Sequence, residues 1–465
     1  MHAAADGGLA RVRVPGGRLT ATQLREIARA SASYGNGVIE LTSRANIQVR
    51  GLGPDGGFAA RMADAGLLPS ATHERVRNVL ASPLTGLDGP GGGGIADVTP
   101  LVEELDRRLC ARPALAALPG RFMFALDDGR GDVAGFDADS GILPTGPDEA
   151  AVLLAGADSG LRVPLGGAVT VLLAAADAFL AEQAAQDVTV WRVSELHDGP
   201  ARIATRLRAV LAPPSGAAGP GSGGAVPEPG PGRAGGTGEA GGGTGPVRPR
   251  AAAFGPVGVV PGGDGARVAL GVAVPLGRLT AEQAEALADA AAGGEIRLTP
   301  WRGAVLPGLR KDQVAGTAAR LVAAGLVVDP DSPWIGVTAC TGRPGCARSL
   351  ADVQADAALV IALSGAAGPS GSPGPPDPDG PAGSRGATSP GGTGGAAPVA
   401  GRAPGTGTLP VHWAGCGRRC GRPRGRVADV VATGDGYRVE LDGTGRACAG
   451  IEETAAAVAA ARGDL

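Results

Sequence analysis

Four cysteines in two short glycine-rich stretches are the residues of this chain best suited to bind a metal group. Cys340 and Cys346 lie in VTACTGRPGCARS, and Cys416 and Cys420 lie in HWAGCGRRCGRP. Five residues separate the first pair and three separate the second, which are wider spacings than the Cys-x2-Cys knuckles typical of structural zinc. Four thiolates with glycine-rich backbone around them suit a cubane iron–sulfur cluster. The spacing therefore favours a cluster, with zinc and unligated thiols as the alternatives.

The remaining cysteines and the overall composition indicate the compartment. Cys110 and Cys448 stand alone and are interpreted as ordinary buried cysteines. The amino terminus has no apolar core of signal-peptide length, and the most apolar run, from Val169 to Gln183, contains Asp177 and is shorter than a bilayer requires. We expect a cytoplasmic protein without a membrane partner, in which clustered thiols stay reduced. The net charge of −3 in 465 residues argues against nucleic acid as a partner.

Two segments of the chain repeat each other. VPGGRLTATQLREIARA begins at Val14, and VPLGRLTAEQAEALADA begins at Val274. Each is followed by a related apolar segment, IELTSRANIQVRGL from Ile39 and IRLTPWRGAVLPGL from Ile296. We interpret each copy as a strand, a helix and a strand, and the identity of the two copies indicates an internal duplication.

The start of each predicted helix has a capping box. Thr20 and Gln23, and again Thr280 and Gln283, have the Thr-x-x-Gln spacing of that motif. The apolar residues that follow share one helical face in each copy. These residues are Leu24, Ile27 and Ala28 in the first copy and Ala284, Leu287 and Ala288 in the second.

The repeat and two low-complexity segments divide the chain. Neither low-complexity segment has hydrophobic periodicity, so both are expected to be disordered. We predict an α+β fold with pseudo-twofold symmetry, in which two small units pair and two larger α/β domains accompany them. The predicted ranges are 8–80 for the first small unit, 81–211 for the first α/β domain, 212–250 for a linker, 251–330 for the second small unit, and 331–465 for the second α/β domain with an insert at 364–407.

The cysteine spacing, together with three other stretches, resembles the sulfite/nitrite reductase family. Cys-x5-Cys followed by Gly-Cys-x3-Cys is similar to that family's cluster signature, and LTSRANIQVRGL resembles its strand with an active-site arginine. HERVRNVLASPLTGLD from His73 and LPGRFMFALDDGRGD from Leu118 are further matches. The resemblance implies paired ferredoxin-like half domains and a [4Fe–4S] cluster beside a tetrapyrrole.

Within the family, the shorter length and the wording TACTGRPGCARSLADVQADA are most similar to the precorrin-3B synthases. That resemblance implies an oxidoreductase of the monooxygenase type in aerobic cobalamin biosynthesis. Its substrate would be the tetrapyrrole precorrin-3A, which dioxygen hydroxylates at carbon 20 of the macrocycle while an acetate arm closes a γ-lactone. The cofactor would be the [4Fe–4S] cluster, and members of this group are also associated with a mononuclear non-haem iron. No dinucleotide-binding motif follows a strand in the expected context, so we expect an external electron donor.

The resemblance also implies which residues face the substrate. The anion-binding cations of the reductases map to Arg44, Arg77 and Arg121, and the fourth position is Met123. Methionine cannot donate a proton, which counts against sulfite or nitrite reduction and less against binding a large polycarboxylate through planar guanidinium groups. The alternative is a structural role for these arginines, in which each forms a surface salt bridge or braces a helix.

Two neighbours of Arg44 complete the predicted site. Strand side chains alternate, so Asn46 and Gln48 are expected to share a face with Arg44 towards the substrate. A second departure from the family is Arg419, a bulky cation where a small residue usually precedes the last cysteine. It would either crowd a cluster or bind a carboxylate.

Two alternatives to this function remain. One is a ferredoxin-dependent sulfite or nitrite reductase with bound sirohaem, in which Cys420 would bridge the cluster and the haem iron. The other is a non-catalytic metal-binding protein that has kept the cysteines. A cluster alone gives a broad brown absorbance, sirohaem adds sharp bands, and zinc gives none.

Overall fold

The computed structural model describes residues 2–54, 56–87, 92–211, 254–263, 265–291, 293–366 and 409–463. The predicted linker at 212–250 and residues 367–407 of the predicted insert lie outside the described residues. The first residues of that insert are described, and they continue helix α8 (Val353–Ala366), in which the Ser364 hydroxyl donates to the Val360 carbonyl at 2.9 Å. The helix therefore extends beyond the position at which we expected the insert to begin.

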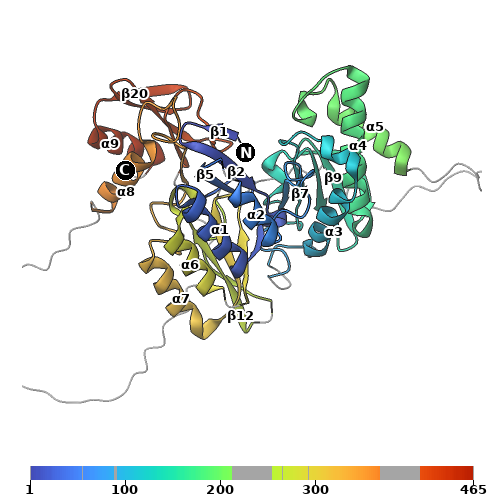
Figure 1. Cartoon of the computed structure of the whole chain (residues 1–465), viewed down its shortest axis with the longest axis horizontal. Coiled ribbons are helices and arrows are strands. Elements are labelled where there is room, and N and C mark those ends of the chain that lie inside the picture. The colour runs from blue at the N-terminus through green and yellow to red at the C-terminus, as the bar shows by residue number, and fades with distance from the viewer. Residues whose placement is uncertain are drawn as a thin grey trace, which may run out of the picture.

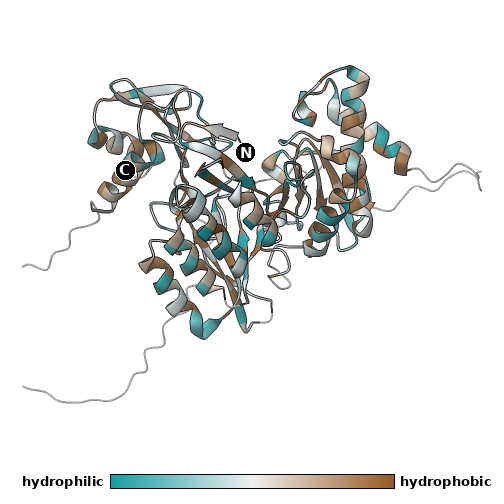
Figure 2. Cartoon of the chain, in the orientation of Figure 1, coloured by the Kyte–Doolittle hydropathy of each residue, from teal (hydrophilic) through white to brown (hydrophobic). Residues whose placement is uncertain are grey.

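The described residues form four sheets of five strands each. Figure 1 shows a central unit, coloured blue and yellow, with one α/β domain on each side of it. The predicted α+β fold with an internal duplication is confirmed, and the central unit consists of the two ferredoxin-like halves. Hydrophilic residues lie on the outer sides of the central helices, as the teal segments of α1 (Ala21–Tyr34), α6 (Ala281–Ala290) and α7 (Lys311–Ala323) show in Figure 2.

The two central sheets exchange a strand with each other, which the sequence analysis did not anticipate. The first sheet has the order β1 (His2–Ala4), β2 (Gly7–Val12), β5 (Ile47–Leu52), β4 (Val38–Leu41) and β13 (Arg278–Thr280). The second has the order β11 (Gly258–Pro261), β12 (Arg267–Ala273), β15 (Gly303–Arg310), β14 (Glu295–Leu298) and β3 (Arg18–Thr20). Each sheet therefore ends in a short strand that belongs to the other repeat.

The exchanged strands occupy equivalent places in the two sheets. Leu19 of β3 lies opposite Ile296 of β14, and Leu279 of β13 lies opposite Ile39 of β4. All four side chains are buried in one core that extends through both halves. The duplicated sequence thus forms a single packed unit with pseudo-twofold symmetry.

Both predicted capping boxes are present. The Gln23 backbone N–H donates to the Thr20 hydroxyl at 3.0 Å while the Gln23 side chain accepts from the Thr20 backbone, and Thr280 and Gln283 repeat this arrangement. The predicted apolar faces are buried against the sheets. Helix α2 (Gly57–Asp64) follows the first copy of the repeat, as α7 follows the second.

The two outer domains share one topology. The first has the strand order β10 (Ala157–Pro164), β9 (Glu149–Leu154), β8 (Ser140–Pro144), β7 (Phe124–Leu126) and β6 (Val79–Ala81), with helices α3 (Thr99–Cys110), α4 (Ala168–Gln186) and α5 (Gly199–Leu211). The second has the order β16 (Val337–Ala339), β17 (Val411–Ala414), β18 (Ala428–Thr433), β19 (Gly436–Leu441) and β20 (Thr444–Cys448), with α8 and α9 (Ile451–Arg462). In each sheet the first three strands along the chain are parallel and the last two are antiparallel.

Short 3-10 turns connect these elements at Pro15–Gly17, Pro113–Ala117, Ala134–Phe136, Leu165–Gly167, Val193–Glu195 and Pro275–Gly277. Helix α4 and the turn before it correct one expectation. The helical segment Leu165–Gln186 is long and apolar enough to cross a membrane, whereas we expected this run to be too short. More than half of its apolar window is buried inside the first α/β domain, where Leu172 and Phe179 belong to the core, so its apolarity is that of a core helix.

Candidate active site at the cysteine loops

Parallel pairing of two strands brings the cysteine loops together. Cys340 directly follows β16, and Cys416 lies two residues after β17. Because the two strands are parallel, their carboxyl ends meet at the same edge of the sheet. The Cys340 backbone N–H donates to the Trp413 carbonyl at 2.8 Å, and the Gly415 N–H donates to the Cys340 sulfur at 3.2 Å.

The sulfur atoms of the two loops influence each other. Burial raises the pKa of the Cys340 thiol, and the neighbouring Cys420 and Cys346 groups raise it further, while the backbone N–H groups of Gly415 and Gly342 lower it. A thiol in this position stays protonated unless a metal stabilises the thiolate. Backbone N–H groups directed at sulfur are also a means by which proteins tune iron–sulfur clusters.

The cysteine sulfurs are not gathered tightly. In the described part of the chain, no three cysteine sulfurs lie within 4.8 Å of one another. The residues fit an iron–sulfur cluster by the chemistry of the donor set, because two cysteine loops share one edge of the sheet and a backbone N–H is directed at the Cys340 sulfur. At the base of the loops, a Cβ on Gly415 would lie 1.8 Å from the Ser349 hydroxyl oxygen, so only glycine fits there.

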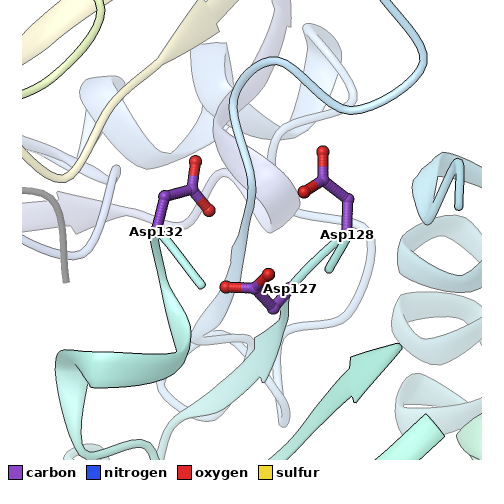
Figure 3. A group of neighbouring side chains, drawn as sticks. All are labelled: Asp127, Asp128 and Asp132. Carbon is purple, nitrogen blue, oxygen red and sulfur yellow. The ribbon is translucent and has the colours of Figure 1, made fainter. Parts of the chain in front are cut away.

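Three aspartates do lie within 4.8 Å of one another, at the equivalent place in the first α/β domain. Asp127 directly follows β7, which corresponds to β17, and Figure 3 shows its carboxylate between those of Asp128 and Asp132. The sequence analysis did not identify this cluster. Burial raises the pKa of Asp132 to about 8, and the nearby Asp127 contributes to the same shift.

Each carboxylate of this cluster already has a hydrogen-bond or ion-pair partner within the protein. Asp127 accepts hydrogen bonds from the backbone N–H groups of Gly129, Gly131, Val133 and Ala134. Asp128 forms an ion pair with Arg130 at 2.7 Å, and Asp132 accepts from the Ser82 hydroxyl. These contacts explain the cluster as the structural element that folds the loop after β7.

Arginines gather between the central unit and the first α/β domain. The pKa of Arg13 is lowered to about 10, chiefly by burial and next by the charges of Arg44 and Arg11. Burial likewise lowers the pKa of Arg44 to about 10, with Arg192 and Arg121 as the next largest causes. The Nε atom of Arg13 is buried without a hydrogen-bond partner among the described residues. Such a concentration of cations is costly without an anion to balance it.

Arg11 and Arg13 were missed in the sequence analysis. The signal was present, because the alternation of arginine and valine in LARVRVP places successive arginines on one face of an extended segment. Neither residue has an ion pair among the described contacts, whereas Arg192 pairs with Asp139 at 2.9 Å. The unpaired positive charge is therefore concentrated on Arg11, Arg13 and Arg44.

The geometry around Arg44 differs from the predicted strand. Residues 42–46 form a turn in which the Ala45 N–H donates to the Thr42 carbonyl at 3.1 Å, and Ala45 has a φ of 52°. Strand β5 begins only at Ile47, so the expected alternation from Arg44 through Asn46 does not hold. Arg44 is half-buried, and its guanidinium lies 3.5 Å from the Gly120 carbonyl oxygen.

The two predicted neighbours of Arg44, Asn46 and Gln48, bind other groups of the protein. Asn46 is 1% exposed, and its side-chain oxygen accepts from the Val14 N–H at 2.8 Å while its nitrogen contacts Asn78 at 3.4 Å. It therefore braces the turn instead of facing an open site, contrary to expectation. Gln48 is half-buried on the polar face of the first sheet and donates to Glu40 at 2.6 Å.

The remaining predicted cations have different surroundings. Arg77 is buried and binds both carboxylate oxygens of Asp106 on α3 at 2.7 Å, which is the brace for a helix that we considered as its alternative role. Arg121 is exposed and lies close enough to Arg44 to affect its pKa. Met123 is 4% exposed and packs in the central core, so this position contributes neither charge nor polarity to the site.

The loop between Cys416 and Cys420 is held from two sides. Arg419 forms an ion pair with Glu440, and its Nε atom lies 3.7 Å from a carboxylate oxygen of Asp429. Its side chain is therefore neither free nor placed over the cysteines. Arg302 reaches from the second half and donates to the Gly421 carbonyl at 3.1 Å. The loop is thus fixed by cations that are not cluster ligands.

His412 lies directly beneath this loop and is fully buried. Burial lowers its pKa to about 3, with Arg302 as the next largest cause, so it is neutral at ordinary pH. The Thr338 hydroxyl lies 3.1 Å from the Val411 carbonyl oxygen and is hydrogen-bonded to Nδ1 of His412 at 2.9 Å. We interpret His412 as a structural histidine.

Two cavities adjoin the arginine cluster. One of about 290 Å³ lies between β2 and α2 and includes Arg11, Arg13 and Arg77 in its lining. The other, of about 480 Å³, lies beside Gly120 and Trp191. Arg75 lines both, so the cavities are neighbours, and their combined size is within the range of small-molecule sites.

Residues 2–56 and 260–324 match the model of the nitrite/sulfite reductase ferredoxin-like half domain. The chain therefore has this half domain twice. The matched ranges lie within the two halves of the central unit, and they confirm the resemblance to paired ferredoxin-like half domains. The roles of the individual site residues stay predictions.

Named relatives include both kinds of enzyme considered above. A ferredoxin–nitrite reductase of Synechococcus elongatus is 33% identical over 132 residues, which cover 26% of this chain and 25% of that protein. A precorrin-3B synthase of a Sinorhizobium species is 34% identical over 125 residues, which cover 27% of this chain and 26% of that protein. The chain thus spans about a quarter of the length of these relatives in the alignments.

A solved structure shares the whole fold. The NirA protein of Mycobacterium tuberculosis has a TM-score of 0.63 with this chain and is 22% identical in sequence. The superposition covers 93% of this chain and 74% of NirA, so both outer domains are included along with the central unit. At this identity the likeness shows the fold alone.

Proposed function

We propose that the chain is an iron–sulfur oxidoreductase that acts on a polycarboxylate tetrapyrrole, with the dioxygen-dependent hydroxylation of precorrin-3A as its reaction. The observation that carries this proposal is the cluster of unpaired cations formed by Arg11, Arg13 and Arg44, next to a buried Met123. A substrate with several acetate and propionate arms supplies the balancing anions, and planar guanidinium groups bind carboxylates through paired hydrogen bonds.

The four cysteine sulfurs would hold a [4Fe–4S] cluster, which passes single electrons when bound. The balance of the reaction is simple: one oxygen atom of dioxygen enters the substrate, and the other leaves as water after two electrons and two protons are added. No residue of this chain supplies the electrons, so an external donor is part of the proposal. The arginines bind and orient the substrate, and their permanent charge at neutral pH keeps the carboxylate arms ionised.

A reductase of sulfite or nitrite is the second candidate, because the names of several relatives favour it. The burial of Met123 in the core counts against it, since this position does not supply the fourth cation expected of the reductase site. A protein that only binds metal is the third candidate, and it would show no turnover.

The test uses the full chain with its metal content reconstituted. We expect precorrin-3A to gain one oxygen atom from labelled dioxygen in the presence of a reductant, detected by mass spectrometry. Parallel assays with sulfite and nitrite and reduced viologen should show no turnover, and the absorption spectrum should lack sirohaem bands. Reduction of either anion without oxygenation of the tetrapyrrole would refute the proposal.

A further inference from the structure

The first cysteine loop is held by a residue from outside its own domain. Arg50 on β5 donates through Nη2 to the Gly345 carbonyl at 2.6 Å, and Gly345 immediately precedes Cys346. The Arg50 side chain is 7% exposed. A buried guanidinium of the first half therefore binds the backbone next to a cysteine sulfur, although the two residues are separated by 295 positions in the sequence.

The charge of Arg50 is balanced by a single carboxylate. Its Nε and Nη2 atoms donate to the two carboxylate oxygens of Asp6 at 2.9 Å and 2.8 Å. Asp6 lies immediately before β2, so both members of the pair belong to the amino-terminal sheet. An opposed pair of charges thus lies beside the loop between Cys340 and Cys346.

The packing at this point is close. A Cβ on Gly345 would lie 2.8 Å from the Thr341 side chain and 3.1 Å from an Asp6 carboxylate oxygen. The absence of a side chain at position 345 allows the ion pair to approach the loop, and we infer that the contact is a built feature.

A second contact from the same sheet holds the other end of the loop. Arg278 on the exchanged strand β13 donates to the side-chain oxygen of Gln354, and the Gln354 nitrogen donates to the Cys340 carbonyl at 3.0 Å. The two arginines lie on strands on either side of β4. The polar face of the first sheet therefore binds the carbonyl before Cys346 directly, through Arg50, and reaches the Cys340 carbonyl through Gln354 of α8.

We propose that the Asp6–Arg50 pair positions the Cys346 side of the loop and balances its own two charges, each of which alone would shift the reduction potential of the metal group that the cysteines bind. This inference rests on the proposed function for the presence of that group. A fixed cation nearby stabilises the reduced form, which has one more negative charge, and a fixed anion has the opposite effect. In the intact pair the two effects largely cancel, so removal of either partner exposes the other.

The two single substitutions should shift the midpoint potential of the metal group in opposite directions. Arg50→Gln leaves Asp6 unbalanced and should lower the midpoint potential of the metal group. Asp6→Asn leaves Arg50 unbalanced, with its bond to Gly345 as an anchor, and should raise the potential. The double variant should return towards the value of the unmodified protein. A purely structural role would give shifts of one sign, or loss of iron from all three variants.

The experiment is a redox titration of the holoprotein monitored by electron paramagnetic resonance, with iron and acid-labile sulfide measured for each variant. The matched control is Arg310–Asp312, an exposed two-bond pair at the start of α7 whose two residues bind each other. Arg310→Gln and Asp312→Asn should leave the potential unchanged. Opposite shifts in the Asp6 and Arg50 variants alone would support the inference.

Two results would overturn the inference, and they differ in what else they overturn. Shifts of the same sign, or no shift, with full iron content in the Asp6 and Arg50 variants would reject the tuning role and leave the proposed function standing. Absence of iron and sulfide from the unmodified protein would reject the cysteine assignment, and the inference with it. If the potentials of the Asp6 and Arg50 variants shift in opposite directions but the unmodified protein does not turn over precorrin-3A, only the proposed substrate is rejected.

Discussion

Arg18 and Arg278 occupy equivalent positions on the two exchanged strands, and each reaches a helix of a different outer domain. Arg18 forms an ion pair with Glu103 on α3 at 2.6 Å, whereas Arg278 binds the amide of Gln354 on α8. The Gln354 amide has a second partner, because its nitrogen also donates to the Cys340 carbonyl, whereas the Glu103 carboxylate has no such link among the described residues. The duplicated contact is thus structural on one side and connected to the cysteine loops on the other.

Replacing any of the four paired cysteines by serine is expected to abolish the iron–sulfur group, because an alkoxide is a harder and more basic ligand than a thiolate. The affected positions are Cys340, Cys346, Cys416 and Cys420. Iron and acid-labile sulfide per chain are the measurement. Cys110→Ser and Cys448→Ser are the controls, since both residues lie outside the two loops. Full iron in one of the four variants, or its loss in a control, would contradict the assignment.

Arg44→Ala is expected to keep its iron content and lose turnover. The side chain lies in the arginine cluster and not in the cysteine loops, and removal of one guanidinium that binds a carboxylate should cost about 2–5 kcal/mol of binding. The measurement is kcat/KM for the tetrapyrrole, together with the iron content. Arg25→Ala is a suitable control, because Arg25 binds Glu285 and Asp289 on the far surface formed by α1 and α6. Activity near that of the control would place Arg44 outside the site.

Substrate affinity is expected to fall at alkaline pH earlier than in a site made of ordinary arginines. Burial lowers the pKa of Arg13 and of Arg44 to about 10, so both are charged below that pH and lose their charge as the pH rises through it. The dissociation constant of a polycarboxylate porphyrin, measured by fluorescence quenching between about pH 8 and pH 11, should therefore rise over this window. The Arg13→Gln variant should bind more weakly at the lower pH and show a smaller change. Affinity independent of pH would contradict the assignment of these cations.

Gly415→Ala is expected to destabilise the cysteine loops. The new Cβ would lie 1.8 Å from the Ser349 hydroxyl, and overpacking of this kind typically costs about 1–3 kcal/mol. We expect lower iron content and a lower thermal midpoint. Gly417→Ala is the matched control two residues away, because nothing lies within 4 Å of the position its Cβ would take. Equal iron content in the two variants would show that the contact is not important.

Much of the fold could be predicted because its signals are local. The repeated capping boxes and apolar faces fix two helices and the strands that follow them, and the buried Leu24 and Leu287 confirm those assignments. The exchange of β3 and β13 could not be predicted, because three-residue strands have the same pattern whichever sheet they join. Pairing between distant segments is decided by packing of the whole core.

The candidate site was predictable in part for similar reasons. Cysteine is rare in this chain and its spacing is specific, so the two loops could be identified from sequence. The surroundings of the arginines could not, because the left-handed Ala45 interrupts the strand pattern and turns Arg44 away from Asn46. The partner of Arg77 was equally invisible, since Asp106 lies 29 residues further along the chain.

The exchanged strands have a consequence for how the chain folds during its synthesis. The first sheet lacks β13, and so its β4 edge stays open, until residue 280 has left the ribosome. Arg18 likewise waits for Glu295, which is 277 positions away. Contacts of such long range are slow to form, and an unpaired strand edge invites association with other chains. A nascent first half is therefore vulnerable to pairing with a neighbour on the same messenger, and it cannot complete its own sheet as a separate fragment.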